Sequence, residues 1–70
     1  MKNAKKVEEL RAKYPVGTRV VLDKMDDPQS PPAGTSGMVR FVDDMASIHM
    51  AWETGSTLAL IPGVDEFHAL

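Results

Sequence analysis

The chain has 70 residues, a formal net charge of −2 at pH 7 and no cysteine. A domain of this size buries only about 60% of its unfolded surface, so its margin of stability is small. Without cysteine it forms no disulfide and no thiolate metal site, and we expect a well-packed core or self-association to stabilise it. No apolar run is long enough to span a membrane and no apolar signal region follows the basic N-terminus, which favours a cytoplasmic protein.

The charge is unevenly distributed along the chain. Residues 1–20 carry six Lys or Arg and two Asp or Glu, a net charge of +4. Residues 21–70 carry two Lys or Arg and eight Asp or Glu, a net charge of −6. We expect a basic N-terminal helix within residues 1–14, followed by one acidic domain at residues 15–70. Nucleic-acid-binding domains present a clear basic patch, and only the N-terminal segment could supply one here.

The N-terminal segment predicts a helix over residues 3–13. Most of its residues favour helix, and Asn3 suits the cap position because its side-chain oxygen accepts a free backbone N–H of the first turn. Pro15 ends the helix, because it disfavours the helical conformation of the residue before it. One narrow apolar stripe is expected to dock the helix on the rest of the chain, and its members are Val7, Leu10 and Tyr14.

The remaining sequence is mainly β. Alternation of apolar and polar residues predicts strands at 18–23, 38–42, 48–53 and 57–61, and a short last strand at 67–70. Residues 24–33 contain three prolines, which exclude a central strand and predict a loop. About five short strands at this spacing favour a small closed or half-open barrel, and we expect Phe67 to plug one end of it.

Several motifs stand in order along most of the chain. They are GTRV at 17–20, DP at 27–28, PAGTSGMV at 32–39, VDD at 42–44, IHMAW at 48–52 and LIPGVDEF at 60–67. Together they resemble a family of short proteins of unknown function that are encoded by phages, plasmids and other mobile elements. The core also resembles the SH3-like barrel class, in which a Gly-Thr-x-Gly-x-Val strand and a Trp-acidic-x-Gly hairpin recur. The resemblance implies an SH3-like barrel behind an N-terminal helix, and it implies no catalytic residue.

The sequence contains no catalytic or metal-binding set. Nucleophilic catalysis needs a nucleophile, a base and an orienting group, and Ser36, Ser47 and Ser56 lie in or beside turns without such partners. Asp43 and Asp44 are adjacent, so their side chains point apart, and turn chemistry explains both. We therefore expect a protein that is not an enzyme and that uses no metal and no cofactor.

Six side chains are candidates for contact with a partner or ligand: Trp52, His49, Arg40, Arg19, Tyr14 and Met25. Trp52 has two open roles, either a core ring with its N–H satisfied or a binding platform at the barrel mouth. His49 alternates away from the apolar face of its strand, so we expect it to face solvent or an interface. Arg19, Arg40 and the helix lysines could contact phosphate across a subunit interface, with Trp52 against a base, and Met25 could add to an adaptable apolar surface.

These observations support three functional hypotheses. The first is a non-catalytic binding module of a phage or mobile element that engages a host or phage protein and forms a homo-oligomer. The second is an anti-defence protein that sequesters a nucleotide-type immune signal. The third is nucleic-acid binding through the lysines of the helix, with an affinity that falls steeply with salt; the acidic domain makes it the least favoured. No membrane partner is expected.

Overall fold

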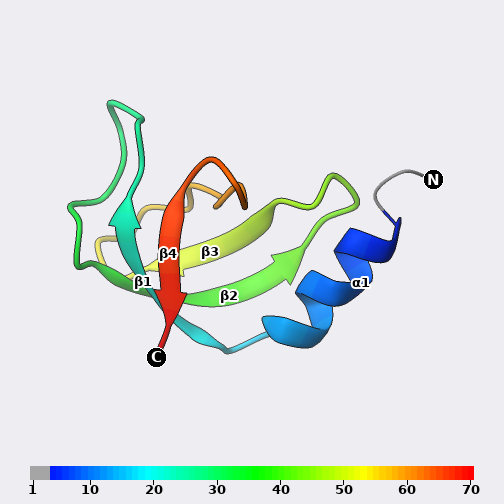
Figure 1. Ribbon diagram of the computed structural model, residues 1–70. Coiled ribbons are helices and arrows are strands. Elements are labelled where there is room, and N and C mark those ends of the chain that lie inside the picture. Colours follow the sequence, from blue (N-terminus) through cyan, green and yellow to red (C-terminus); the bar gives the residue numbers. More distant parts are fainter. Residues whose placement is uncertain (1–3) are drawn as a thin grey trace.

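The computed structural model describes residues 4–70 as one helix and four strands (Figure 1). These elements are α1 (Ala4–Lys13), β1 (Arg19–Lys24), β2 (Ser36–Val42), β3 (Ile48–Trp52) and β4 (Glu66–Ala69). The strands form one antiparallel sheet in the order β3-β2-β1-β4. The predicted mainly β fold with an N-terminal helix is confirmed, whereas the helix cap predicted at Asn3 lies outside the described residues.

The sheet is open, with β3 and β4 at its two edges, and it has four strands instead of about five. The strand predicted at 57–61 is wrong, because only Leu60 of that segment pairs with the sheet, through two hydrogen bonds of 2.8 Å with Ile48. The physical reason is that the Leu58 carbonyl accepts a hydrogen bond of 2.9 Å from the indole Nε1 of Trp52. This bond draws the backbone toward a side chain rather than toward a neighbouring strand.

The helix α1 packs its apolar stripe against β2 and the core. Val7 and Tyr14 are buried, with 4% and 9% of their surface exposed, and Leu10 packs on the same cluster. The Tyr14 ring meets Phe67 of β4 edge to face, with 5.6 Å between the ring centroids. The predicted stripe is therefore confirmed, and helix and sheet share one core. No helix within residues 4–70 is long and apolar enough to cross a membrane.

The core lies on one face of the sheet, because side chains alternate between the two faces of a strand. Its members from β1, β2 and β3 are Val20, Leu22, Val39, Val42, Ile48, Met50 and Trp52. In β2 the alternation shifts at Arg40, which is an extra residue between the pairs Val39–Met50 and Phe41–His49. This bulge turns Phe41 to the outer face and returns Val42 to the core.

Gly37 of β2 lies opposite Trp52 of β3 and against its ring. A Cβ atom at Gly37 would lie 2.7 Å from Cε3 and 3.1 Å from Cδ2 of the indole, and 3.0 Å from the Ala51 carbonyl oxygen. Carbon atoms do not approach so closely, so the indole reaches this position only because the residue beneath it is glycine.

We expect Gly37→Ala to destabilise the fold by about 1–3 kcal/mol, the usual cost of overpacking a filled core. The added methyl group must displace either the indole of Trp52, which is held by its own hydrogen bond, or the backbone of β3. Urea unfolding followed by circular dichroism measures the change, with Ser36→Ala in the same strand as the control. Equal unfolding midpoints for Gly37→Ala and the wild type would show that the close approach does not constrain the fold.

Candidate functional site

The ladder between β1 and β2 stops before β2 ends. In its last bonds the Gly17 N–H donates to the Val39 carbonyl at 2.8 Å, and the Val39 N–H donates to the Thr18 carbonyl at 2.9 Å. Pro15 has no N–H with which to extend the ladder, and the chain before it leads into α1. Because β2 continues to Val42, a groove opens between the end of β2 and α1.

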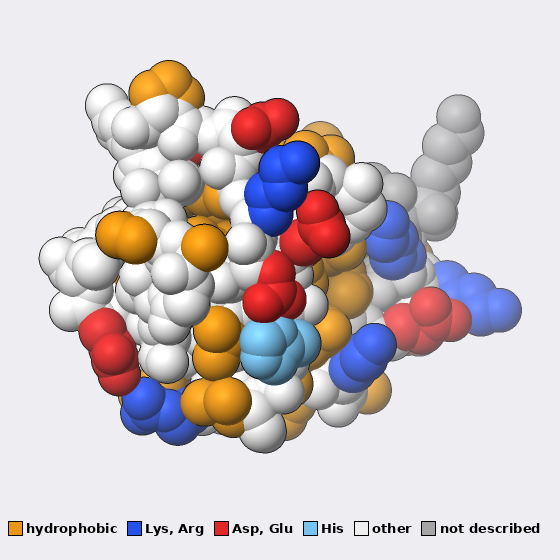
Figure 2. Space-filling view, turned by 60° about the vertical axis from the view of Figure 1, so that its left-hand side comes forward, with side chains coloured by type: hydrophobic (Ala, Val, Ile, Leu, Met, Phe, Trp, Pro, Cys, Tyr) orange, Lys and Arg blue, Asp and Glu red, His pale blue; other side chains and the backbone are white. Residues whose placement is uncertain are grey.

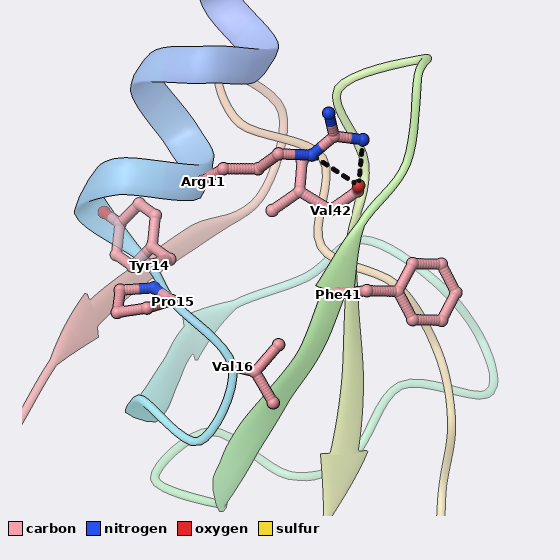
Figure 3. Close-up of a pocket in the computed structure, with 6 residues that line it drawn as sticks. All are labelled: Arg11, Tyr14, Pro15, Val16, Phe41 and Val42. Atoms are coloured by element: carbon pink, nitrogen blue, oxygen red, sulfur yellow. Dashed lines mark hydrogen bonds between the residues drawn. The ribbon is translucent and has the colours of Figure 1, made fainter.

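Arg11 of α1 ties the helix to the end of β2 across this groove. Its Nη2 and Nε donate to the Val42 carbonyl at 2.8 and 3.2 Å (Figure 3). Nη2 also lies 3.3 Å from the Asp44 carboxylate, but both side chains are largely exposed, so this ion pair adds little stability. The planar guanidinium of Arg11 thus supplies the hydrogen bonds that the Val42 carbonyl would otherwise accept from a neighbouring strand.

The groove holds a pocket of about 510 Å³. Its lining consists of one charged side chain and five apolar or aromatic ones: Arg11, Tyr14, Pro15, Val16, Phe41 and Val42. Val16 is 75% exposed and points toward β2, whereas the 46% exposed ring of Phe41 projects away from α1 and forms the far rim (Figure 3). Exposed apolar side chains around a concave surface are typical of a contact site.

The turn after β2 is closed by Asp43. Its Oδ1 accepts the N–H groups of Met45 and Ser47, each at 2.9 Å, and its Oδ2 lies 2.7 Å from Nε2 of His49. The hydrogen bond with His49, followed by the one from the Ser47 N–H, lowers the pKa of Asp43. The His49 ring also stacks on Phe41, with 4.3 Å between the ring centroids. This network therefore supports the rim of the groove.

Of the six side chains predicted to contact a partner, Tyr14 is the one that lines the groove. Of the two roles considered for Trp52, the structure shows the core role, because the ring is 3% exposed and its N–H donates to the Leu58 carbonyl. Met25 is half-buried and packs against the core. His49 lies on the outer face of β3, half-buried beside Phe41.

The two predicted arginines are not brought together with Trp52. Arg19 forms an exposed ion pair with Glu53, at 2.9 Å between Nη2 and Oε1. Arg40 is exposed at the bulge of β2. Within one chain, therefore, the Trp52 ring lies in the core, whereas both arginines are on the surface.

Sequence reasoning missed Arg11, Val16 and Phe41. One signal was present, because two adjacent apolar residues, Phe41 and Val42, interrupt the alternation of their strand, and a bulge produces this pattern. Nothing in the sequence marks Arg11, since its role depends on a carbonyl 31 residues away.

The surface carries mixed charges and two His–Asp pairs. On the face shown in Figure 2, Lys and Arg lie near Asp and Glu, with hydrophobic side chains between them. His49 and Asp43 are 2.7 Å apart, and His68 and Asp23 are 2.8 Å apart. In the part of the chain that the structure describes, no group of three or more His, Cys, Asp or Glu could hold a metal ion.

A family model matches nearly the whole chain. The model described as "Domain of unknown function (DUF4314)" covers residues 3–70. No curated protein and no solved structure is significantly similar to the chain. The family match agrees with the resemblance to a family of unknown function, and it brings no activity, ligand or partner with it.

We expect the stabilisation by Asp43 to depend on pH. Its pKa is lowered in the folded protein from an ordinary value of 3.8, so the carboxylate stabilises the fold above that pH, and this contribution is lost as the pH falls through the folded-state pKa. Urea midpoints of the wild type and Asp43→Asn, measured from about pH 7 to about pH 2.5, should therefore converge toward acid.

Asp44→Asn is the control for this experiment, because the Asp44 side chain is 82% exposed in the same turn. The urea midpoint of Asp44→Asn should stay close to that of the wild type across the pH range. The prediction would be contradicted if the urea midpoints of the wild type and Asp43→Asn differed by the same amount at neutral and at acid pH.

Proposed function

The chain belongs to the DUF4314 family, and we propose that it is a non-catalytic module that binds another protein. The observation that carries the proposal is the groove between α1 and the end of β2. It combines a pocket of about 510 Å³ with the exposed apolar side chains of Val16 and Phe41. Its walls come from two elements held together by Arg11, so the groove is formed before any partner arrives.

The charges beside the groove favour an acidic partner. The Nζ of Lys13 lies 5.5 Å from the centroid of the Tyr14 ring in the wall of the pocket, and Arg40 is exposed next to the rim. Arg11 also lines the pocket, and its charge is paired with that of Asp44 at 3.3 Å. An extended peptide with one apolar anchor and flanking Asp or Glu fits this surface, with the anchor in the pocket and the carboxylates near the cations.

The origin and setting of the protein form part of the same proposal. We infer a protein of a phage or mobile element that acts on a host or phage protein in the cytoplasm. Its support is the resemblance of the ordered motifs, from GTRV at 17–20 to LIPGVDEF at 60–67. A relation to SH3-like barrels is supported by the strand order, in which β1, β2 and β3 pair in sequence and β4 returns beside β1.

Sequestration of a nucleotide-type signal is an alternative without an observation in its favour. It draws on Arg19, Arg40, the helix lysines and Trp52 as contacts across a subunit interface; within one chain Arg19 is paired with Glu53, and the buried Trp52 ring offers no exposed face to a base. Nucleic-acid binding through the helix is likewise weaker, because residues 21–70 carry a net charge of −6.

Selection from a random peptide library on the immobilised protein tests the proposal. We expect enriched peptides to share one large apolar residue with Asp or Glu on either side. Their affinity should fall about tenfold or more for Val16→Glu, because the new carboxylate occupies the apolar groove and repels the acidic flanks. Binding of the enriched peptides to the wild type and the variant is measured by fluorescence anisotropy.

Val64→Glu is the matched control, because Val64 is 72% exposed, close to the 75% of Val16, and lies outside the pocket lining. It should leave peptide affinity unchanged. Peptides that bind both variants as they bind the wild type, or a library without enrichment, would contradict the proposed groove. Thermal stabilisation by a nucleotide panel, measured alongside, would instead support the alternative.

A further inference from the structure

β4 is an edge strand with a free side. Within residues 4–70 it pairs with β1 alone. The Leu70 N–H donates to the Arg19 carbonyl at 2.9 Å, so the backbone groups of Leu70, and those of His68 two residues earlier, point toward β1. The N–H and C=O groups of Phe67 and Ala69 therefore point to the free side, where they form a template for another strand.

We infer that a second copy of this chain pairs with β4 in antiparallel orientation, about a two-fold axis at His68. In this register Phe67 of each copy lies opposite Ala69 of the other, and each such pair exchanges both backbone hydrogen bonds. The two sheets then become one continuous sheet. The interface is isologous, the commonest arrangement among homodimers.

The same axis places Leu70, which is 75% exposed, opposite Glu66 of the second copy and at the end of the strand next to the turn that carries the 72% exposed Val64. On the outer face, Glu66 lies diagonal to His68 of the second copy, a spacing at which cross-strand side chains interact.

A second copy is the occupant that these features favour, because the free backbone groups of Phe67 and Ala69 match each other about the axis and Glu66 of each copy lies beside His68 of the other. A domain of 70 residues also has a small core and gains stability from an additional paired strand. The groove beside α1 is lined by no residue of β4, so this inference is independent of the proposed peptide binding.

A single introduced cysteine tests the register, because the chain has none of its own. In the inferred dimer the two residues at position 68 form a pair without mutual backbone bonds, with Cα atoms about 4.5 Å apart, which suits a disulfide. We expect His68→Cys to form a covalent dimer about tenfold faster, or more, than Met45→Cys, whose position is 76% exposed in a turn far along the chain. Equal rates would overturn the inference.

A pair of backbone variants tests the edge itself. Ala69→Pro removes an N–H that faces the free side and leaves the bonds to β1, whereas Ala69→Thr keeps that N–H. Light scattering should give twice 7.7 kDa for the wild type and Ala69→Thr, and 7.7 kDa for Ala69→Pro, with native circular dichroism in each case. A wild type of 7.7 kDa at every concentration, or a dimeric Ala69→Pro, would overturn the inference. If Ala69→Pro unfolds, the rates of covalent dimer formation by the two cysteine variants decide whether the inference holds.

Discussion

The contact between Trp52 and Gly37 fixes how β3 packs on β2. The indole approaches β2 where no Cβ intervenes, and its N–H reaches the Leu58 carbonyl at 2.9 Å. The Trp52 side chain thereby joins β2, β3 and residues 57–61, which form no strand. Since the ring is 3% exposed, it cannot serve as a surface platform, and the exposed aromatic ring of the sheet is that of Phe41 instead.

A second constraint is the point at which the ladder between β1 and β2 stops. Pro15 ends both the helix and the ladder, because it disfavours helix in the preceding residue and has no N–H to donate. The end of β2 is then held by Arg11 rather than by a strand. The groove is the space left between these elements, so it depends on the same docking of α1, through Val7 and Tyr14, that completes the core.

Tyr14 connects the two surfaces proposed for interaction. Its ring meets Phe67 of β4, and its side chain also lines the groove. Phe67 in turn lies in the strand whose free side is the inferred dimer edge. The contact between these two aromatic rings therefore places the groove and the inferred dimer edge side by side.

Local sequence patterns predict the mainly β class, the helix with its apolar stripe and the end of that helix before Pro15. They also predict β1, β2, β3 and β4 to within one or two residues. These features follow from periodicity and proline chemistry, which act between near neighbours. Tyr14 could be predicted as a site residue because it lies on the periodic stripe. Contacts between segments settle three further features: residues 57–61 form no strand, Trp52 is buried and Arg11 closes one side of a groove. The Trp52 indole bonds to the Leu58 carbonyl and Arg11 bonds to a carbonyl 31 residues away, and local periodicity predicts neither pairing.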